Sequence, residues 1–97
     1  MAQVVYSGEA LGDLERLFEF MAGRDPYAAS AAVVAIRDAV SLLADHPLIG
    51  RPATEPLREL VVSFGDSGYV ALYRHRPERD EVRILAIRHQ RELDYPA

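Results

Sequence analysis

The pattern of apolar residues changes its period once along the 97-residue chain, and this change limits the folds that the chain can adopt. Before the segment HPLIGRP (His46–Pro52), apolar residues recur every three or four positions, as in an amphipathic helix. After it, stretches rich in β-branched and aromatic residues alternate with turn sequences, as in antiparallel strands. The length suffices for one hydrophobic core, so we expect a single domain over residues 1–97.

The first half predicts a strand at 3–6 followed by two helices. Ser7 is a favourable N-cap residue for the first helix, which should end near Gly23. Asp25 and the proline after it give the second helix its N-cap and first residue. Pro47 disfavours helical geometry at the preceding residue, so the second helix should end just before it, after a run to about Leu43.

The second helix should have an unusually wide apolar surface. From residue 26 to residue 43 it carries only Arg37 and Asp38 as charges, so we expect it to be covered on two sides. The short connection at 22–25 makes the two helices antiparallel neighbours, and one of them can lie between its partner and a sheet.

The second half predicts three strands at 57–64, 69–75 and 81–89. They are separated by GDSG (Gly65–Gly68) and RPERD (Arg76–Asp80), which are sequences typical of hairpin connections. The element order is therefore β-α-α-β-β-β. We predict an α+β fold in which a helical hairpin packs on a largely antiparallel sheet. In the connection before the first of these strands, we expect Leu48 and Ile49 to close one end of the core.

Strict alternation assigns the faces of the strands. On the last strand it places on one face Val82, Ile84, Ala86 and Arg88, and on the other face Arg83, Leu85, Ile87 and His89. On the middle strand it separates Tyr69 and Tyr73 from Val70, Leu72 and Arg74. Both faces are apolar in mid-strand, so the face without helices needs a cover or forms a binding surface.

The sequence lacks the signatures of several classes of site. There is no cysteine and no phosphate-binding glycine motif, and the three histidines lack metal-ligand spacing, so we expect neither a metal nor a cofactor. We find no signal peptide and no run near the roughly 20 apolar residues that span a bilayer. We therefore expect a cytoplasmic protein without a membrane partner.

Charge is distributed unevenly along the chain. The net charge is −4, all eleven cations are arginine, and residues 1–50 hold three arginines against seven acids, whereas residues 51–97 hold eight against eight. A group near the predicted strand ends comprises Arg58, Arg74, Arg88, His89 and Arg91, with Tyr95 a few residues further on. The simple interpretation is that these are solvated charges that protect strand edges. The alternative is that the arginines converge on a phosphate, with His89 or Tyr95 moving a proton.

Four segments carry a resemblance to a known family. They are HPLIGR (His46–Arg51), LREL (Leu57–Leu60), SGYVALYR (Ser67–Arg74) and ILAIRHQRE (Ile84–Glu92). In this order and with the element order above, the chain resembles the RelE/ParE superfamily of toxins from type II toxin–antitoxin and plasmid-stabilisation modules. The resemblance implies a cognate antitoxin that wraps the toxin and adds helices or a strand. Two assemblies are left open, a homodimer and a toxin–antitoxin hetero-oligomer.

The resemblance leaves two toxin mechanisms open. ParE-like members inhibit DNA gyrase without hydrolytic chemistry, whereas RelE-like members are metal-independent ribonucleases that cut mRNA on the ribosome. The long second helix, HPLIGR and HQR (His89–Arg91) look more ParE-like, and an acidic chain without lysine is poorly suited to many phosphate contacts. We therefore favour the gyrase inhibitor, which is not an enzyme.

Each mechanism implies its own site residues. For gyrase binding, the contact would be the helical hairpin with the arginine-bearing sheet end, whose candidates are Arg58, Arg74, Arg88 and Arg91. For an mRNA interferase, Arg74 and Arg88 would bind phosphate while His89 or Tyr95 moves the proton. A third possibility is a binding module with no toxicity.

Overall fold

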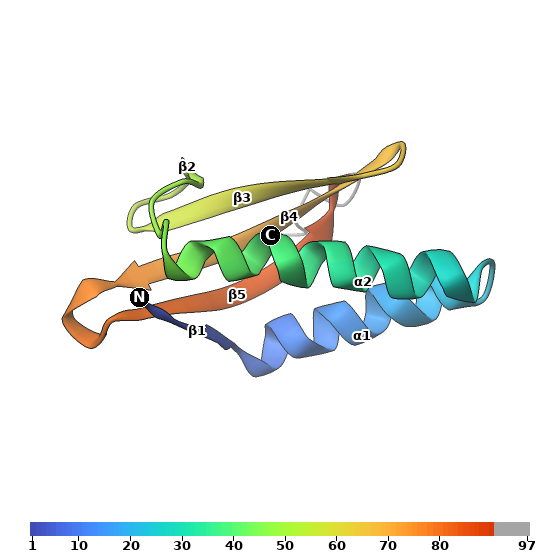
Figure 1. Cartoon of the computed structure of the whole chain (residues 1–97), viewed down its shortest axis with the longest axis horizontal. Helices are drawn as coiled ribbons and strands as arrows, with labels where there is room; N and C mark the ends of the chain where they lie inside the picture. The colour runs from blue at the N-terminus through green and yellow to red at the C-terminus, as the bar shows by residue number, and fades with distance from the viewer. Residues whose placement is uncertain (91–97) are drawn as a thin grey trace.

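The computed structural model describes residues 1–90, which form two helices and a five-stranded sheet (Figure 1). The elements in chain order are β1 (Gln3–Tyr6), α1 (Gly8–Ala22), α2 (Pro26–Ser41), β2 (Arg51–Pro52), β3 (Leu57–Phe64), β4 (Ser67–Arg76) and β5 (Glu81–His89). Short 3-10 helices, η1 (Leu42–Ala44) and η2 (Pro77–Arg79), follow α2 and β4. The predicted α+β fold is confirmed, with the two-residue β2 as an element that the sequence did not indicate.

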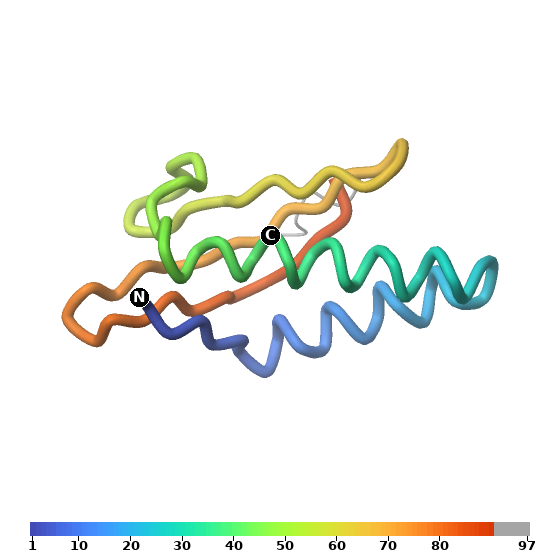
Figure 2. Tube along the Cα trace, viewed as in Figure 1, coloured from blue at the N-terminus to red at the C-terminus, as the bar shows by residue number. Residues whose placement is uncertain are grey.

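The strands lie in the order β1-β5-β4-β3-β2. β1 pairs in parallel with β5, and the other neighbours are antiparallel. The sheet is therefore largely antiparallel, as predicted, and the first strand lies beside the last because the helical hairpin carries the chain across the sheet (Figure 2).

Both helices cover the same face of the sheet. They run antiparallel and side by side, with α1 packed on β5 and α2 on β3 (Figure 1). The expectation that one helix separates its partner from the sheet is therefore wrong, because each helix supplies its own residues to one shared core. The largest side chains that are fully buried there include Ile36, Leu43, Tyr73, Ile84 and Ile87. The α2 side that faces away from α1 and the sheet stays exposed at Tyr27 and Val34.

The predicted helix starts are confirmed in detail. The Ser7 side chain accepts a hydrogen bond from the backbone N–H of Ala10, and the Asp25 carboxylate accepts from the N–H groups of Tyr27 and Ala28. Each cap satisfies backbone donors that have no partner inside the helix, and contributes about 1 kcal/mol.

The second helix is long and apolar enough to cross a membrane, contrary to the expectation that no run comes near that length. α2 and η1 together form a helical run over residues 26–44, whose 19 residues and mean hydropathy of 1.5 match a bilayer span in length and composition. Buried residues along this run, such as Ile36, Val40 and Leu43, pack in the core described above. The run is thus longer and more apolar than expected from the sequence, and its apolar residues serve the core.

The loop between η1 and β2 is held in place by the buried side chain of Tyr73 on β4. The Tyr73 hydroxyl donates to the carbonyl of Pro47 at 2.8 Å and accepts from the N–H of Gly50 at 2.9 Å. Burial raises the pKa of Tyr73 above its ordinary value of 10.0, so the hydroxyl keeps the proton that it donates. Leu48 and Ile49 are exposed, so the expectation that they close the core is wrong: the tyrosine fills that position instead.

The pairing of β4 with β5 contains an irregularity that changes the faces of β5. Leu72 pairs with Ala86 and Tyr73 with Ile84, so Leu85 is an extra residue, a β-bulge. Val82, Ile84 and Ile87 consequently all lie in the core, whereas strict alternation placed Ile87 opposite the other two. The predicted faces of β5 are wrong beyond residue 84, and those of β4 are consistent with the observed core.

Gly50 provides a test of the tyrosine contact. A Cβ at Gly50 would lie 2.5 Å from the Tyr73 hydroxyl oxygen and 2.8 Å from the carbonyl oxygen of Glu59. We expect Gly50→Ala to lower the free energy of unfolding by about 2–3 kcal/mol, measured by urea unfolding, because overpacking forces these groups apart. In the control Gly12→Ala, a Cβ on α1 meets nothing within 4 Å, so stability should rise by about 0.5–1 kcal/mol. Equal effects of the two substitutions would contradict the account of this loop.

Candidate functional site

The arginines predicted to converge are separated along the sheet. Arg74 pairs with Arg83 near the η2 end, whereas Arg88 pairs with Val70, four residues away along β4. At about 3.3 Å per residue the two arginine positions are about 13 Å apart. The expectation that Arg74, Arg88 and His89 share one end of the sheet is wrong, because β4 and β5 run in opposite directions.

His89 lies on the helix-facing side of the sheet, away from Arg74. Its ring meets Tyr69 edge to face, with 5.3 Å between ring centroids. Tyr69 is buried, and its hydroxyl donates to the sulfur of Met21 at 3.1 Å. Since Arg74 follows the core residue Tyr73 on β4, its side chain belongs to the opposite face.

Arg88 has a structural partner on α1. Its Nη1 lies 2.6 Å from Oδ2 of Asp13, whose carboxylate is buried and also accepts the backbone N–H of Ile87 at 2.9 Å. Asp13 thereby takes the place of a neighbouring strand, because β1 ends at Tyr6 and leaves this part of the β5 edge without one.

Arg58 also holds the backbone in place. Its guanidinium donates to the carbonyls of Leu48 at 3.2 Å and Gly50 at 2.8 Å, across the loop that Tyr73 anchors. Arg91 and Tyr95 lie outside the described residues. The predicted cluster is therefore not brought together within the part of the chain that the structure describes.

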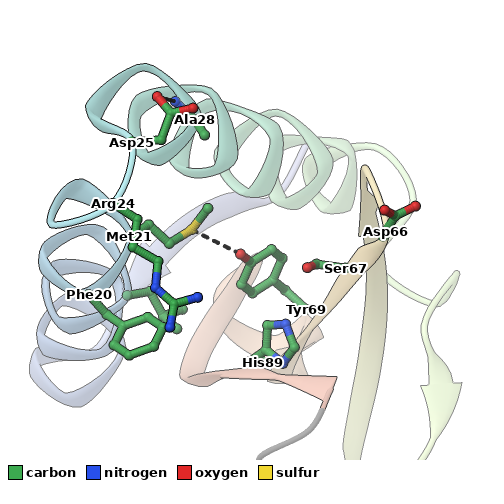
Figure 3. A pocket seen from close by; sticks show the side chains of 10 residues that line it. Phe20, Met21, Arg24, Asp25, Ala28, Asp66, Ser67, Tyr69 and His89 are labelled. Carbon is green, nitrogen blue, oxygen red and sulfur yellow. Dashed lines mark hydrogen bonds between the residues drawn. The ribbon is translucent and has the colours of Figure 1, made fainter.

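A cleft of about 510 Å³ opens beside His89 (Figure 3). The end of α1 and the start of α2 form one wall, and the start of β4 forms the other. The residues around it include Phe20, whose ring carries the Arg24 guanidinium 5.4 Å from its centroid, and the exposed Asp25 and Asp66. Apolar walls with both signs of charge at the surface suit a side chain of a protein partner.

On the face without helices, two arginines stand directly opposite each other. Arg83 follows the core residue Val82, so it shares this face with its cross-strand partner Arg74. Like charges in this arrangement destabilise a sheet, because side chains directly opposite are about 5 Å apart at Cβ. Glu81 makes an ion pair with Arg83 at 3.3 Å, whereas Arg74 is exposed and makes no hydrogen bond or ion pair within residues 1–90.

Arg83 was not among the predicted site residues, although the sequence of the hairpin contains a signal for its pairing with Arg74. In a hairpin centred on η2, residues equally distant from the turn face each other, and this places 74 opposite 83 and 76 opposite 81. The Arg74 charge also reaches Glu78 in the turn. The pKa of Glu78 is lowered mainly by its own backbone N–H, and further by Arg76 and Arg74.

No group of three or more potential metal ligands is found among residues 1–90. Two arginine side chains on one face offer planar donors for a carboxylate or a phosphate oxygen. The described part of the chain therefore presents two candidate sites, the cleft beside His89 and the arginine pair Arg74–Arg83.

Asp13 provides a test of how β5 is held. Asp13→Ala leaves the buried N–H of Ile87 without its acceptor and removes the carboxylate that pairs with Arg88, so the free energy of unfolding should fall by about 3 kcal/mol in urea unfolding. Asp13→Asn keeps an oxygen for the N–H of Ile87 and should lose about half as much. The exposed Glu15→Gln on the same helix is the control and should stay within about 0.5 kcal/mol of wild type. If Asp13→Ala matched Glu15→Gln, the proposed role of Asp13 would be wrong.

Comparison with known proteins gives consistent results. Residues 4–94 match the family described as "ParE toxin of type II toxin-antitoxin system, parDE". Toxin RelE3 of Caulobacter vibrioides is 40% identical over 92 residues, which are 95% of this chain and 98% of that protein. A chain of the chromosomal ParDE TA system from P. aeruginosa has a TM-score of 0.75 and 25% identity, over 92% of this chain and 96% of that one. A chain of the toxin–antitoxin complex RelBE2 from Mycobacterium tuberculosis has a TM-score of 0.59 and 26% identity, over 92% of this chain and 98% of that one. These similarities extend over nearly the whole chain.

Proposed function

The chain belongs to the ParE toxin family of type II toxin–antitoxin systems, within the RelE/ParE superfamily, and on that premise we propose that it arrests growth by binding DNA gyrase. The resemblance seen in the sequence is thereby confirmed at the level of the superfamily. The proposal concerns the target and the mode of action: a binding inhibitor in the cytoplasm, where gyrase is found, rather than an RNA-cleaving enzyme.

The separation of the arginines carries this proposal. A ribonuclease needs cations and a proton-transfer group around one phosphate, within hydrogen-bond reach of the reacting atoms. Here Arg74 lies about 13 Å along the sheet from Arg88, and His89 is on the other face from Arg74. Arg88 is also engaged by Asp13. These positions support binding rather than cleavage.

A cognate antitoxin is the second part of the proposal. The ParDE and RelBE2 neighbours are described as a TA system and a toxin–antitoxin complex. This chain exposes large apolar side chains beside the cleft and at the start of α2, with Phe20 68% and Tyr27 88% exposed. An antitoxin segment that covers these side chains would remove apolar surface from water, which favours binding by roughly 25 cal/mol per Å².

The RelE-like ribonuclease remains as the second candidate. The name of the RelE3 relative at 40% identity favours it, and so does the position of His89 at a cleft next to Arg88 in the chain. In that case His89 would act from the cleft, with Arg88 as its neighbouring cation, and Arg74 would lie outside the site. The third possibility, a binding module without toxicity, predicts that expression has no effect on growth.

Two assays on one purified sample test the proposal. With the chain in excess, we expect gyrase to lose most of its supercoiling activity, and primer extension on translated mRNA to reveal no new 5′ ends. Growth should stop when the chain is expressed alone and recover when the antitoxin gene encoded beside it is induced.

The opposite pattern, codon-linked mRNA ends with supercoiling intact, would refute gyrase inhibition in favour of the ribonuclease. His89→Ala would then be compared with His46→Ala, an exposed histidine in the loop before β2. Loss of cleavage in the first variant alone would assign the reaction to the cleft.

A further inference from the structure

We infer that Arg74 and Arg83 together form a docking site for a carboxylate-bearing segment of the antitoxin, on the face of the sheet opposite the helices. This inference rests on the proposed function, since it names where and through which chemistry the antitoxin is held. The occupant is an acidic and partly apolar peptide segment.

In the free protein, the facing positions of Arg74 and Arg83 are electrostatically unfavourable. Two cations directly opposite on adjacent strands repel each other, at a cost of a few tenths of a kcal/mol to about 1 kcal/mol. Arg74 is exposed and makes no hydrogen bond or ion pair within residues 1–90, although its charge acts on Glu78 in the turn. A carboxylate placed between the two guanidinium groups would turn this repulsion into charge-assisted hydrogen bonds.

The end of the molecule that carries the arginine pair has a small surplus of positive charge. Three other cations of this end of the molecule lie near carboxylates: Arg83 is paired with Glu81, Arg76 with Glu78, and Arg51 with Glu59. Arg58 and Arg79 also lie at this end, as do Glu55 and Asp80, so positive charge exceeds negative charge there by about one. One surplus charge matches one or two carboxylates of a peptide. A nucleic acid needs a series of phosphate contacts, which a surplus of one charge on a chain with a net charge of −4 does not supply.

The arginine pair has one apolar neighbour on each side across the sheet and is accessible to a peptide. Across the sheet, Val5 of β1 lies beside Arg83 and Leu57 of β3 beside Arg74, and both are half-buried. The Arg83 side chain is 40% exposed. Both helices lie on the other face, so among the described elements no helix covers the pair (Figure 1). Arginines flanked by apolar side chains are typical of sites that anchor a partner.

The test is the affinity of the antitoxin, encoded beside the toxin gene and purified as the probe, for three toxin variants. Arg74→Glu should bind roughly 30-fold more weakly or worse, and Arg83→Glu should be similar, because each replaces a cation by a charge that repels the partner carboxylate. Arg37→Glu is the matched control: it makes the same charge change on the exposed part of α2 and should change the affinity less than threefold. Titration calorimetry at about 150 mM salt measures all three.

The stability of the free protein distinguishes a binding role from a structural one. Arg74→Glu creates an ion pair with Arg83, so its Tm should equal or exceed that of wild type by a few degrees. Weak binding by a variant with a lowered Tm would instead count as damage to the fold and would overturn the inference. Replacing the antitoxin carboxylates one at a time by arginine should yield a variant that restores binding to Arg74→Glu.

The other outcomes separate this inference from the proposed function. If wild type binds the antitoxin and Arg74→Glu binds it equally well, the docking site is wrong and the function stands. If wild type does not bind the antitoxin, the docking site and the cognate-antitoxin part of the proposed function both fail, whereas gyrase inhibition is decided by the supercoiling assay. If a 30-nucleotide RNA binds wild type but not Arg74→Glu while antitoxin affinity is unchanged, the pair is a phosphate site and the inference is overturned.

Discussion

The extra residue in β5 decides which face of the sheet carries the residues that follow it, among them Arg88 and His89. The bulge at Leu85 is held by α1: the N–H of Ser7 donates to the carbonyl of Ile84 at 2.9 Å, and its hydroxyl donates to that of Leu85 at 3.2 Å. Asp13 then accepts the N–H of Ile87, two residues beyond the bulge. β1 pairs with β5 only as far as Ile84, so the backbone groups of β5 beyond this residue have no neighbouring strand. Residues at the start of α1 supply their hydrogen-bond partners instead.

This arrangement has consequences on both faces of the sheet. Beyond the bulge, Ile87 joins the core and His89 reaches the cleft between the helix ends and β4. Before the bulge, the regular hairpin register brings Arg83 opposite Arg74 on the other face. One face thus carries the histidine and the other the arginine pair. Because the two sites lie on opposite faces, the geometry supports the proposed binding of partners at separate surfaces over a nuclease with a single reaction centre.

Much of the fold could be predicted from local chemistry. Ser7, Asp25 and Pro47 marked the helix ends because caps and proline act within a few residues. The four predicted strands were found within two residues of their bounds, and only the short β2 was missed. The faces of β5 could not be predicted, because a bulge depends on a tertiary partner, the Asp13 carboxylate, 74 positions away in the chain. The same holds for Arg58, whose acceptors are backbone carbonyls of a loop, and for Tyr73, which appeared only as one apolar residue of a strand. The Arg74–Arg83 pair could have been predicted from the hairpin register, provided that the centre of the turn had been placed at η2.

The separation of Arg74 from the Arg88 end of the sheet is the central claim, and disulfide formation measures it most directly. The chain has no cysteine, so introduced pairs report on geometry without competition. A disulfide requires Cα atoms about 4.4–6.8 Å apart, a range that cross-strand neighbours meet and residues about 13 Å apart do not. Under mild oxidation Arg74→Cys with Arg83→Cys should form an intramolecular disulfide, and Arg74→Cys with Arg88→Cys should stay reduced. The reverse result would mean that the register of β4 and β5, and with it the assignment of both surfaces, is wrong.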